Sequence, residues 1–371
     1  DPMSGDMLKQ VEFGDRINEL AWSPDGSQIA LGTDQGLAII LDPASGDMLK
    51  QVELPGRISQ LAWSPASDFI ASRADTDSSE DTTNWGIYLW DLEAQQAQLA
   101  FSREDVPADQ EYRISEITWS PSGSKFAAVV NDHSVLIRPL TSPGDAHILQ
   151  AYQGDLVIQE IQDFAWSPEE NRLAVAWQET NPGLPGTTTS KHMVMIWDVE
   201  DNTVLDTYPA AEGNFVSWLP DGTLLTEEND QLVFRSEEGA IDRRLPLGYS
   251  IQQSSWSGDH RYLLLQSYTG SLTLWDHEKQ TARSMTLDDF YVQGISQIGW
   301  SPRGDQLTAL GYANGRLSFW DYARDFSPSG SLGGISMFSW SPVDNILAAV
   351  NYDQQLVLYQ GTSRERIRTK P

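Results

Sequence analysis

The chain has 371 residues and no cysteine, and its 24 basic against 53 acidic side chains give a net charge of −29 at pH 7. Such a charge repels nucleic acid and anionic membranes, so neither is an expected partner. The lack of cysteine excludes disulfides, thiolate metal sites and cysteine nucleophiles. Apolar runs reach only five or six residues, as in 126–130, and the first residues lack the pattern of a signal peptide. We therefore expect a chain without a membrane segment, located in the cytoplasm.

Eight tryptophans, most of them followed directly by Ser-Pro, mark an internal repeat. They are Trp22, Trp63, Trp119, Trp166, Trp218, Trp256, Trp300 and Trp340. Successive spacings are 41, 56, 47, 52, 38, 44 and 40 residues. A period of roughly 40 to 45 residues is typical of a propeller blade built from four strands.

The first repeat shows how one such unit is built. Residues 17–22 form an apolar, strand-like stretch, and Ser23-Pro24-Asp25-Gly26 supplies turn chemistry. Further strands are predicted at 28–32, 37–41 and 48–53. Four short strands cannot bury both of their faces alone, so neighbouring repeats must stack. The sequence predicts an all-β fold, an eight-bladed β-propeller of four-stranded antiparallel blades, forming a single domain over residues 1–371.

A near-duplication indicates how the first and last repeats are joined. Residues 1–12 (DPMSGDMLKQVE) almost repeat residues 42–53 (DPASGDMLKQVE), which contain the fourth strand of the first blade. The eighth repeat supplies only three strands of its own, at 335–340, 346–350 and 355–359. The N-terminal strand is therefore expected to complete that blade and close the ring, since an unpaired edge would otherwise remain. The tail at 360–371, which contains RERIRT, competes for the same place.

Four repeats end their third strand with a Trp-Asp pair. These pairs are Trp90-Asp91, Trp197-Asp198, Trp275-Asp276 and Trp320-Asp321, whereas the other four repeats carry Leu41-Asp42, Arg138-Pro139, Arg235-Ser236 and Tyr359-Gln360. Trp-Asp pairs at this position are typical of the WD-repeat β-propeller family, which the chain resembles over essentially its whole length. That resemblance implies a protein-interaction scaffold, monomeric within a larger complex, that binds other proteins or peptides.

Arginine recurs six residues before the first three marker tryptophans. The eight residues at this position are Arg16, Arg57, Arg113, Glu160, Glu212, Ser250, Gly294 and Gly334. Guanidinium groups bind carboxylate or phosphate in a bidentate manner, so three of them on one rim predict a site for an acidic or phosphorylated peptide. Alternatively, the arginines pair with the protein's own acids, of which Glu19, Glu116 and Asp163 lie three residues further on.

Every residue four before a marker tryptophan is polar. The set is Asn18, Ser59, Ser115, Gln162, Asn214, Gln252, Ser296 and Ser336. We interpret these positions as the lining of a wet central channel. They support an alternative function, a small-molecule or sugar-binding and possibly hydrolytic propeller that uses this channel.

Three insertions lengthen the repeats, at 73–86, 178–192 and 102–112. The first two are expected to enlarge the turn between the second and third strands of their blades, where they are either recognition loops or tolerated insertions. Trp85 and Trp177 lie within or beside them and are candidate partner-binding anchors, with core packing as the alternative.

Signs of catalysis or cofactor binding are few. The five histidines, His133, His147, His192, His260 and His277, show neither HxH nor HExxH spacing. The chain lacks a phosphate-binding glycine loop and a GxSxG motif. The acids at 75–81 lack the turn glycine and terminal glutamate of a calcium loop. We expect no metal, no cofactor and no enzymatic activity.

Overall fold

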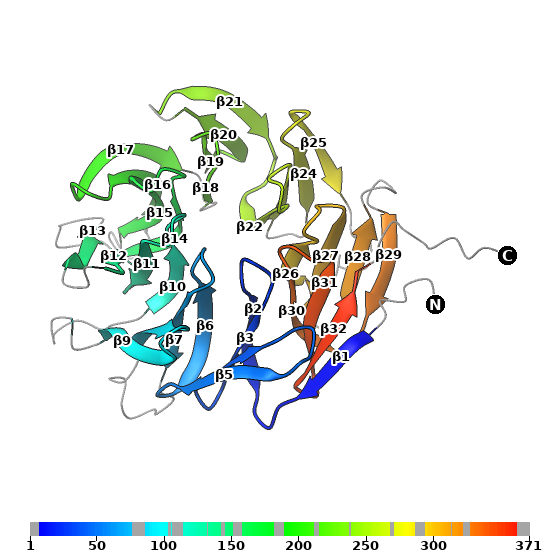
Figure 1. The fold of residues 1–371 in the computed structure, drawn as a ribbon. Helices are drawn as coiled ribbons and strands as arrows, with labels where there is room; N and C mark the ends of the chain where they lie inside the picture. Colours follow the sequence, from blue (N-terminus) through cyan, green and yellow to red (C-terminus); the bar gives the residue numbers. More distant parts are fainter. Residues whose placement is uncertain are drawn as a thin grey trace. The chain divides into compact units, whose positions relative to one another are not determined.

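A computed structural model describes most of the chain, and it is built of β-strands. The described residues are 7–75, 86–102, 105, 114–131, 133–141, 145–150, 158–181, 189–210, 215–236, 239–267, 271–285, 294–312, 314–321 and 327–361. They form eight four-stranded antiparallel sheets that follow one another along the chain (Figure 1), which confirms the predicted all-β repeat. No helix within these residues is long and apolar enough to cross a membrane.

Within each sheet the strands are paired in chain order, except that the eighth sheet takes one strand from the start of the chain. The first four sheets are β2 (Ile17–Trp22), β3 (Ile29–Thr33), β4 (Leu37–Leu41), β5 (Met48–Glu53); β6 (Arg57–Trp63), β7 (Phe69–Asp75), β8 (Gly86–Asp91), β9 (Gln96–Ser102); β10 (Ile114–Trp119), β11 (Lys125–Val130), β12 (Ser134–Pro139), β13 (His147–Gln150); and β14 (Ile158–Trp166), β15 (Arg172–Asn181), β16 (Thr189–Asp198), β17 (Thr203–Ala210). The last four are β18 (Val216–Trp218), β19 (Leu224–Glu228), β20 (Gln231–Arg235), β21 (Ile241–Pro246); β22 (Ile251–Trp256), β23 (Tyr262–Ser267), β24 (Leu272–Asp276), β25 (Thr281–Met285); β26 (Ile295–Trp300), β27 (Gln306–Gly311), β28 (Leu317–Asp321), β29 (Ser327–Leu332); and β30 (Ile335–Trp340), β31 (Ile346–Asn351), β32 (Gln355–Gln360), β1 (Met7–Glu12).

The chain divides into two compact units, which we describe separately. Unit 1 comprises residues 1–101, 255–264 and 274–371, and it holds the first, second, seventh and eighth sheets. Unit 2 comprises residues 102–254 and 265–273, with the third, fourth and fifth sheets. The boundary between the units passes through the sixth sheet.

The closing strand lies where the duplication predicts it. β1 pairs antiparallel with β32, from Met7 opposite Tyr359 to Glu12 opposite Gln355. Figure 1 shows β1, in dark blue, beside β32, in red. Because β1 leads directly into the first sheet, this pairing joins the first and eighth repeats. The rival segment at 362–371 lies outside the described residues.

Burial follows strand order within a sheet. Every residue of β3, β23 and β27 is buried, whereas β5 and β21 alternate between exposed and half-buried residues. The apolar clusters form between adjacent sheets, as where Ile17 and Trp22 of the first sheet pack with Leu356 and Leu358 of the eighth. Stacking of the sheets therefore supplies most of the core, which is why single repeats are not stable units.

Four of the marker tryptophans connect neighbouring sheets through the indole N–H. The Trp22 indole N–H donates to the Ser339 carbonyl oxygen at 3.1 Å, and Trp63 donates to the carbonyl oxygen of Ala21 at 3.2 Å. In both cases the acceptor is the residue just before the marker of the preceding repeat. The same relation joins Trp218 to Ala165 and Trp300 to Ser255. A buried indole N–H needs such a partner, so the repeat carries tryptophan where phenylalanine would fill the space alone.

The serine after most markers organises the first turn of its repeat. Ser23 is fully buried, its Oγ donates to Asp25 at 2.6 Å, and it accepts the N–H of Gln28 at 2.9 Å. Ser257 makes the same pair of bonds with Asp259 and Tyr262. A buried hydroxyl that both donates and accepts fixes this turn at each repeat where it occurs.

The aspartate after the third strand caps the turn into the fourth. Asp91 Oδ1 accepts the N–H of Ala94 at 2.8 Å, and Asp276 Oδ1 accepts that of Lys279 at 3.0 Å. Asp42 does the same for Ala44 at 2.8 Å although no tryptophan precedes it. The aspartate of the Trp-Asp pair therefore has a local role that does not depend on the tryptophan.

The fourth sheet differs from the sequence prediction. Residues 178–192 were expected to form an enlarged turn, but β15 runs to Asn181 and β16 starts at Thr189, with Gln178 paired to His192. The insertion therefore lengthens a hairpin, because its polar ends continue the ladder of backbone hydrogen bonds. Residues 182–188, and residues 76–85 of the first insertion, lie outside the described part of the chain. So do residues 103–104 and 106–112 of the third insertion.

Candidate functional site

The rim of unit 1 is formed where the first strands of its sheets begin. At this end the N–H of the residue after the second strand donates to the carbonyl oxygen six residues before the marker. Asp34 donates to Arg16 at 3.0 Å, Tyr312 to Gly294 at 3.1 Å, and Tyr352 to Gly334 at 2.9 Å. These backbone bonds show that the aligned positions are structurally equivalent. We call the set Arg16, Asp34, Arg57, Tyr312 and Tyr352 the rim.

Arg16 presents its guanidinium to solvent. The residue is exposed, and its side chain has no hydrogen-bond or ion-pair partner among the described residues. The neighbouring Asp15 is fully engaged: Oδ1 accepts the N–H of Arg16 at 2.7 Å, and Oδ2 accepts that of Gln35 at 2.9 Å. Although partial burial raises the pKa of Asp15, the Thr33 hydroxyl and these two N–H groups lower it by more, so the net pKa is below its ordinary value. Asp15 is thus an ionised, internally bonded acid beside an arginine with unused donors.

Arg57 is partly used within the protein. Its Nε lies 3.4 Å from Asp34 Oδ1, and 47% of its side chain is exposed. The same Asp34 oxygen accepts a hydrogen bond from Asn18 at 2.6 Å. Arg57 also lowers the pKa of Glu19, although burial has the larger effect and raises that pKa to about 7. The alternative interpretation was that these arginines form ion pairs with acids of the same protein. It applies to Arg57, which pairs with Asp34, and not to Arg16. Arg113 lies outside the described residues.

The polar residues four before the markers sit on β-bulges. Six first strands shift register here, at Asn18, Ser59, Ser115, Gln162, Ser296 and Ser336. Where hydroxyl contacts are described, they return to the same sheet: Ser59 donates to Asp75 at 2.6 Å, Ser296 to the Leu310 carbonyl at 3.1 Å and Ser336 to the Val350 carbonyl at 3.0 Å. A bulge disrupts ladder bonds, and a short polar side chain repairs the pattern locally.

This local role accounts for the polarity without a ligand. Ser115, Gln252, Ser296 and Ser336 are exposed, and Asn18, Ser59 and Gln162 are half-buried. Asn214 lies outside the described residues. The channel itself stays a prediction.

Two exposed tyrosines on the rim were missed by sequence reasoning. Tyr312 is 79% exposed and Tyr352 is 57% exposed. A Cβ at Gly315 would lie 2.1 Å from the Tyr352 hydroxyl oxygen and 2.7 Å from the Ile335 carbonyl, so glycine lets this ring lie against the neighbouring turn. Aligning the residues that follow each second strand, and not only those before the tryptophan, would have found both.

The prediction that Trp177 is an exposed partner-binding anchor is wrong. Its side chain is only 4% exposed and packs in a core cluster with Trp166 and Trp197. It belongs to β15, whose extension buries the ring between the third and fourth sheets. Trp177 is therefore a core residue and not an exposed partner-binding anchor. Trp85 lies outside the described residues.

The residue three before the marker connects adjacent sheets. Gln297 Oε1 accepts the N–H of Phe338 at 3.1 Å while its amide N–H donates to the carbonyl of the same residue at 2.7 Å. In unit 2, Asp163 Oδ2 accepts a hydrogen bond from the N–H of Val216 at 3.0 Å. Val216 and Phe338 occupy the same position, two residues before their marker tryptophans. Burial raises the pKa of Asp163 to about 7, and the charge of Glu116 adds to this effect. Asp163 is therefore placed for a contact between sheets, and Glu116 lies near enough to repel its charge.

Glu227 carries a second such contact, from β19 to the sixth repeat. It is fully buried, its Oε2 accepts the N–H of Ile251 at 2.9 Å, and Oε1 has no partner among the described atoms. Burial raises the pKa of Glu227 to about 7 from an ordinary value of 4.5. The folded protein therefore binds this proton more tightly than the unfolded chain does.

We predict a pH-dependent gain of stability from Glu227→Gln. As pH rises from about 4.5 to about 7, the unfolded chain loses this proton while folded wild type keeps it, so wild-type stability falls until Glu227 ionises in the fold above pH 7, whereas Gln stays neutral. Above pH 7 the variant should be more stable relative to wild type than at pH 4.5, by on the order of 2 kcal/mol. Urea unfolding at several pH values measures the difference. Glu93→Gln, at an exposed site, controls for the loss of one charge; equal pH profiles for wild type and Glu227→Gln would contradict the prediction.

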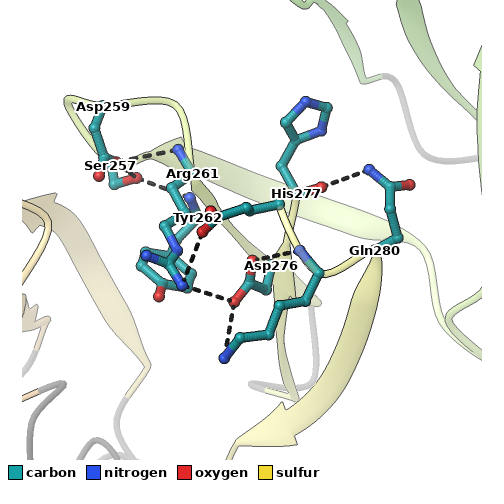
Figure 2. Close-up of polar contacts among 9 residues, drawn as sticks. Ser257, Asp259, Arg261, Tyr262, Asp276, His277 and Gln280 are labelled. Atoms are coloured by element: carbon teal, nitrogen blue, oxygen red, sulfur yellow. Dashed lines mark hydrogen bonds and ion pairs between the residues drawn. The ribbon is translucent and has the colours of Figure 1, made fainter.

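Figure 2 shows a polar cluster in the sixth sheet that is internally paired. Arg261 reaches Asp276 at 3.6 Å and Glu278 at 3.1 Å, and Lys279 lies 3.6 Å from the same Asp276 oxygen. His277 contacts the Trp275 ring edge-on, with centroids 4.9 Å apart. These contacts fix the ends of β23 and β24.

The described residues hold no metal site, and one small hollow lies among them. No group of three or more His, Asp or Glu side chains among them could hold a metal ion. In unit 2, a hollow of about 110 Å³ lies between two turns, lined in part by Arg172, Trp218 and Asp221. It has room for a few water molecules or one side chain, so we assign no small-molecule site to it.

These features define the class of protein. Eight consecutive four-stranded antiparallel sheets, markers joined between neighbouring sheets, capped Trp-Asp ends and a first strand that completes the last sheet are the features of an eight-bladed β-propeller fold.

Comparisons with known proteins agree with this class. Residues 7–66 match the family model of the WD40 domain of anaphase-promoting complex subunit 4. Similar solved structures include the β-propeller domain of Cps50 (Swd1) from Myceliophteria thermophila, with 13% identity over 96% of this chain and 99% of that chain and a TM-score of 0.61. The C-terminal WD40 domain of Sif2 has 16% identity over 95% and 97%, with a TM-score of 0.66. A eukaryotic initiation factor has 16% identity over 96% and 92%, with a TM-score of 0.56. A search of curated proteins finds no match.

Proposed function

We propose that this protein is a non-catalytic protein-interaction scaffold whose rim binds an acidic or phosphorylated segment of a partner. WD40-type propellers generally act as such scaffolds, and the similar structures show the same fold over nearly the whole chain. The observation that carries the finer proposal is Arg16, an exposed guanidinium without a partner among the described side chains, beside an aspartate that is already hydrogen-bonded.

The acids of the rim do not compete equally for Arg16. Asp15 accepts two backbone N–H groups, and Asp34 accepts from Asn18 and pairs with Arg57. A carboxylate or phosphate from a partner would instead meet the free bidentate edge of Arg16. Because the whole chain carries a net charge of −29 that repels an acidic peptide at longer range, the attraction of Arg16 for an anion is local.

The tyrosines extend this surface toward the seventh and eighth sheets. Tyrosine and arginine are the side chains that most often dominate the energetics of protein interfaces. Tyr312 and Tyr352 are exposed, while a Cβ at Gly294, Gly333 or Gly334 would meet no atom within 4 Å. A peptide backbone can therefore approach the rim closely between the rings. We infer a peptide that places its acidic group at Arg16 and its apolar side chains on the tyrosines.

We predict that Arg16→Glu weakens binding of an Asp/Glu-rich or phosphoserine peptide by at least about tenfold, because it replaces a charge-assisted bond with repulsion. Fluorescence anisotropy with such peptides measures this loss. Arg303→Glu is the matched control, since Arg303 is an exposed arginine of unit 1 on the turn after β26, at the opposite end of that strand. Equal losses in both variants, or none in Arg16→Glu, would overturn the role of Arg16.

The remaining parts of the proposal rest on composition and on the resemblance to WD-repeat propellers. We infer a cytoplasmic protein, monomeric itself and working within a larger complex, without nucleic acid as a partner. The alternative of a sugar-binding or hydrolytic channel receives less support, because the hydroxyls of Ser59, Ser296 and Ser336 donate to groups of their own sheets.

A further inference from the structure

Two strands of this chain have the same sequence. β1 and β5 both read MLKQVE, inside 12-residue segments that differ only at Met3 and Ala44. Each is the fourth strand of its sheet, β1 in the eighth and β5 in the first. One sequence therefore fills the same structural place twice, beside different neighbours.

The two copies are paired in the same register. Met7 faces Tyr359 and Lys9 faces Leu358, so the bulge falls at Leu8. In the first sheet Met48 faces Leu41 and Lys50 faces Ile40, and the bulge falls at Leu49. From the lysine to the final glutamate both ladders continue without a shift. The segment MLKQVE thus docks in one defined way.

Its acceptors share little sequence. β32 contributes Gln-Leu-Val-Leu-Tyr and β4 contributes Leu-Ala-Ile-Ile-Leu. Recognition therefore rests on backbone hydrogen bonds, as in other cases where a strand is added to a sheet edge. The side chains of residues 8–12 are all exposed or half-buried, with Leu8 49% exposed. Little buried apolar surface holds β1 in place.

The acceptor cannot remain open without cost. Leu356, Val357 and Leu358 of β32 are only 2–3% exposed. Without a fourth strand, β32 would present unpaired N–H and C=O groups next to these apolar residues, and such an edge recruits another strand. Any copy of MLKQVE in an extended conformation offers the same pairing.

The link from β1 to β2 is short and pinned. Phe13 packs on the cluster between the first and eighth sheets, and Asp15 bonds the N–H groups of Arg16 and Gln35. A Cβ at Gly14 would meet no atom within 4 Å, so the link has space to rearrange at that residue. These contacts favour the intramolecular position of β1, and they mark Asp15 as the residue that restrains its release.

We propose that residues 7–12 exchange between two copies of this chain, each β1 completing the eighth sheet of the other molecule. The exchanged dimer keeps every β1–β32 contact and changes only the link at 13–16. A short tether gives the closed form an effective concentration on the order of millimolar, so exchange requires concentrated protein. Two chains of charge −29 repel each other, so exchange should increase with salt.

Single cysteines test this exchange, because the chain has none of its own. Full-length Glu12→Cys and Gln355→Cys chains with tags of different size are mixed at about 0.5 mM in 0.5 M salt, diluted and then oxidised. The two positions are Cα partners, and the Gln355 amide donates to Glu12 at 2.9 Å. Exchange predicts a disulfide-linked heterodimer. Adding Asp15→Ala to both chains should raise its yield several-fold.

The duplicated strand supplies the control. Glu53 ends the same sequence in β5, but β5 pairs with β4 and is joined to β4 before it and to β6 after it. Glu53→Cys with Gln355→Cys therefore reports random collision only. At least about tenfold more heterodimer from the Glu12 pair would support the proposal. Yields equal to this control would overturn it. So would failure of one chain carrying both Glu12→Cys and Gln355→Cys to form its internal disulfide, since the β1–β32 pairing would then be wrong.

Discussion

Removal of residues 1–12 should destabilise the protein more than any single substitution on its surface. The deletion leaves the outer edge of β32 unpaired along five residues, from Tyr359 to Gln355, while its other edge stays paired with β31. At a net value of roughly 1 kcal/mol for each backbone hydrogen bond, the loss is about 5 kcal/mol. A lower melting temperature by circular dichroism, together with concentration-dependent association through the open edge, is the expected result.

A second deletion makes this result interpretable. Removing residues 362–371 should leave the melting temperature unchanged, because β1 and not the tail occupies the place beside β32. The reverse outcome, in which the tail deletion is destabilising and the loss of residues 1–12 is not, would assign the closing strand to the tail. Addition of a synthetic peptide of residues 1–12 should restore part of the stability of the first deletion and none of the second.

Glu228→Ala is the second variant with a large expected effect. Glu228 is 5% exposed, it pairs through Oε1 with the buried Arg235, and Arg244 lies 2.9 Å from Oε2. Arg235 also donates to the Gly239 carbonyl at 3.2 Å and lies 4.0 Å over the Tyr208 ring. Without the carboxylate, a buried guanidinium loses its counter-charge, which costs about 3–5 kcal/mol. Urea unfolding followed by tryptophan fluorescence measures this loss.

A double variant separates loss of charge balance from loss of packing. Glu228→Leu combined with Arg235→Met removes both charges and keeps apolar volume, and such replacements of a buried pair are often neutral or stabilising. We expect it to recover most of the stability that Glu228→Ala loses. Equal losses in both variants would show that packing around Glu228, and not the unpaired arginine, accounts for the effect. Arg244→Ala should cost less, because 39% of that side chain is exposed.

Much of the fold could be predicted from the sequence. The spacing of eight tryptophans indicated the number of sheets, and the turn residues after Trp22 separated the first two strands within one residue of their observed bounds. The duplication of residues 42–53 identified the closing strand, and the structure shows that both copies pair in the same register. Turn residues and the alternation of apolar residues act over a few positions, so strands and turns can be predicted from the sequence alone.

The site was less accessible from sequence because its partners lie on different repeats. Arg16 and Arg57 occupy equivalent positions, yet only Arg57 pairs with Asp34, since the second sheet places it beside the turn of the first. Tyr312 and Tyr352 come from turns that no motif marks. Trp177 resembled an exposed anchor until the extension of β15 buried it.

The sequence by itself determined the strands, their turns, the order of the repeats and the strand that joins the last repeat to the first. Only the tertiary structure decided which charges are paired, which are buried and which face solvent. Glu227 and Glu228 are neighbours in β19, but one bonds the backbone of the next repeat and the other a pair of arginines. The physical reason is that burial and electrostatics depend on which residues stacking brings together, and stacking joins positions roughly 40 residues apart.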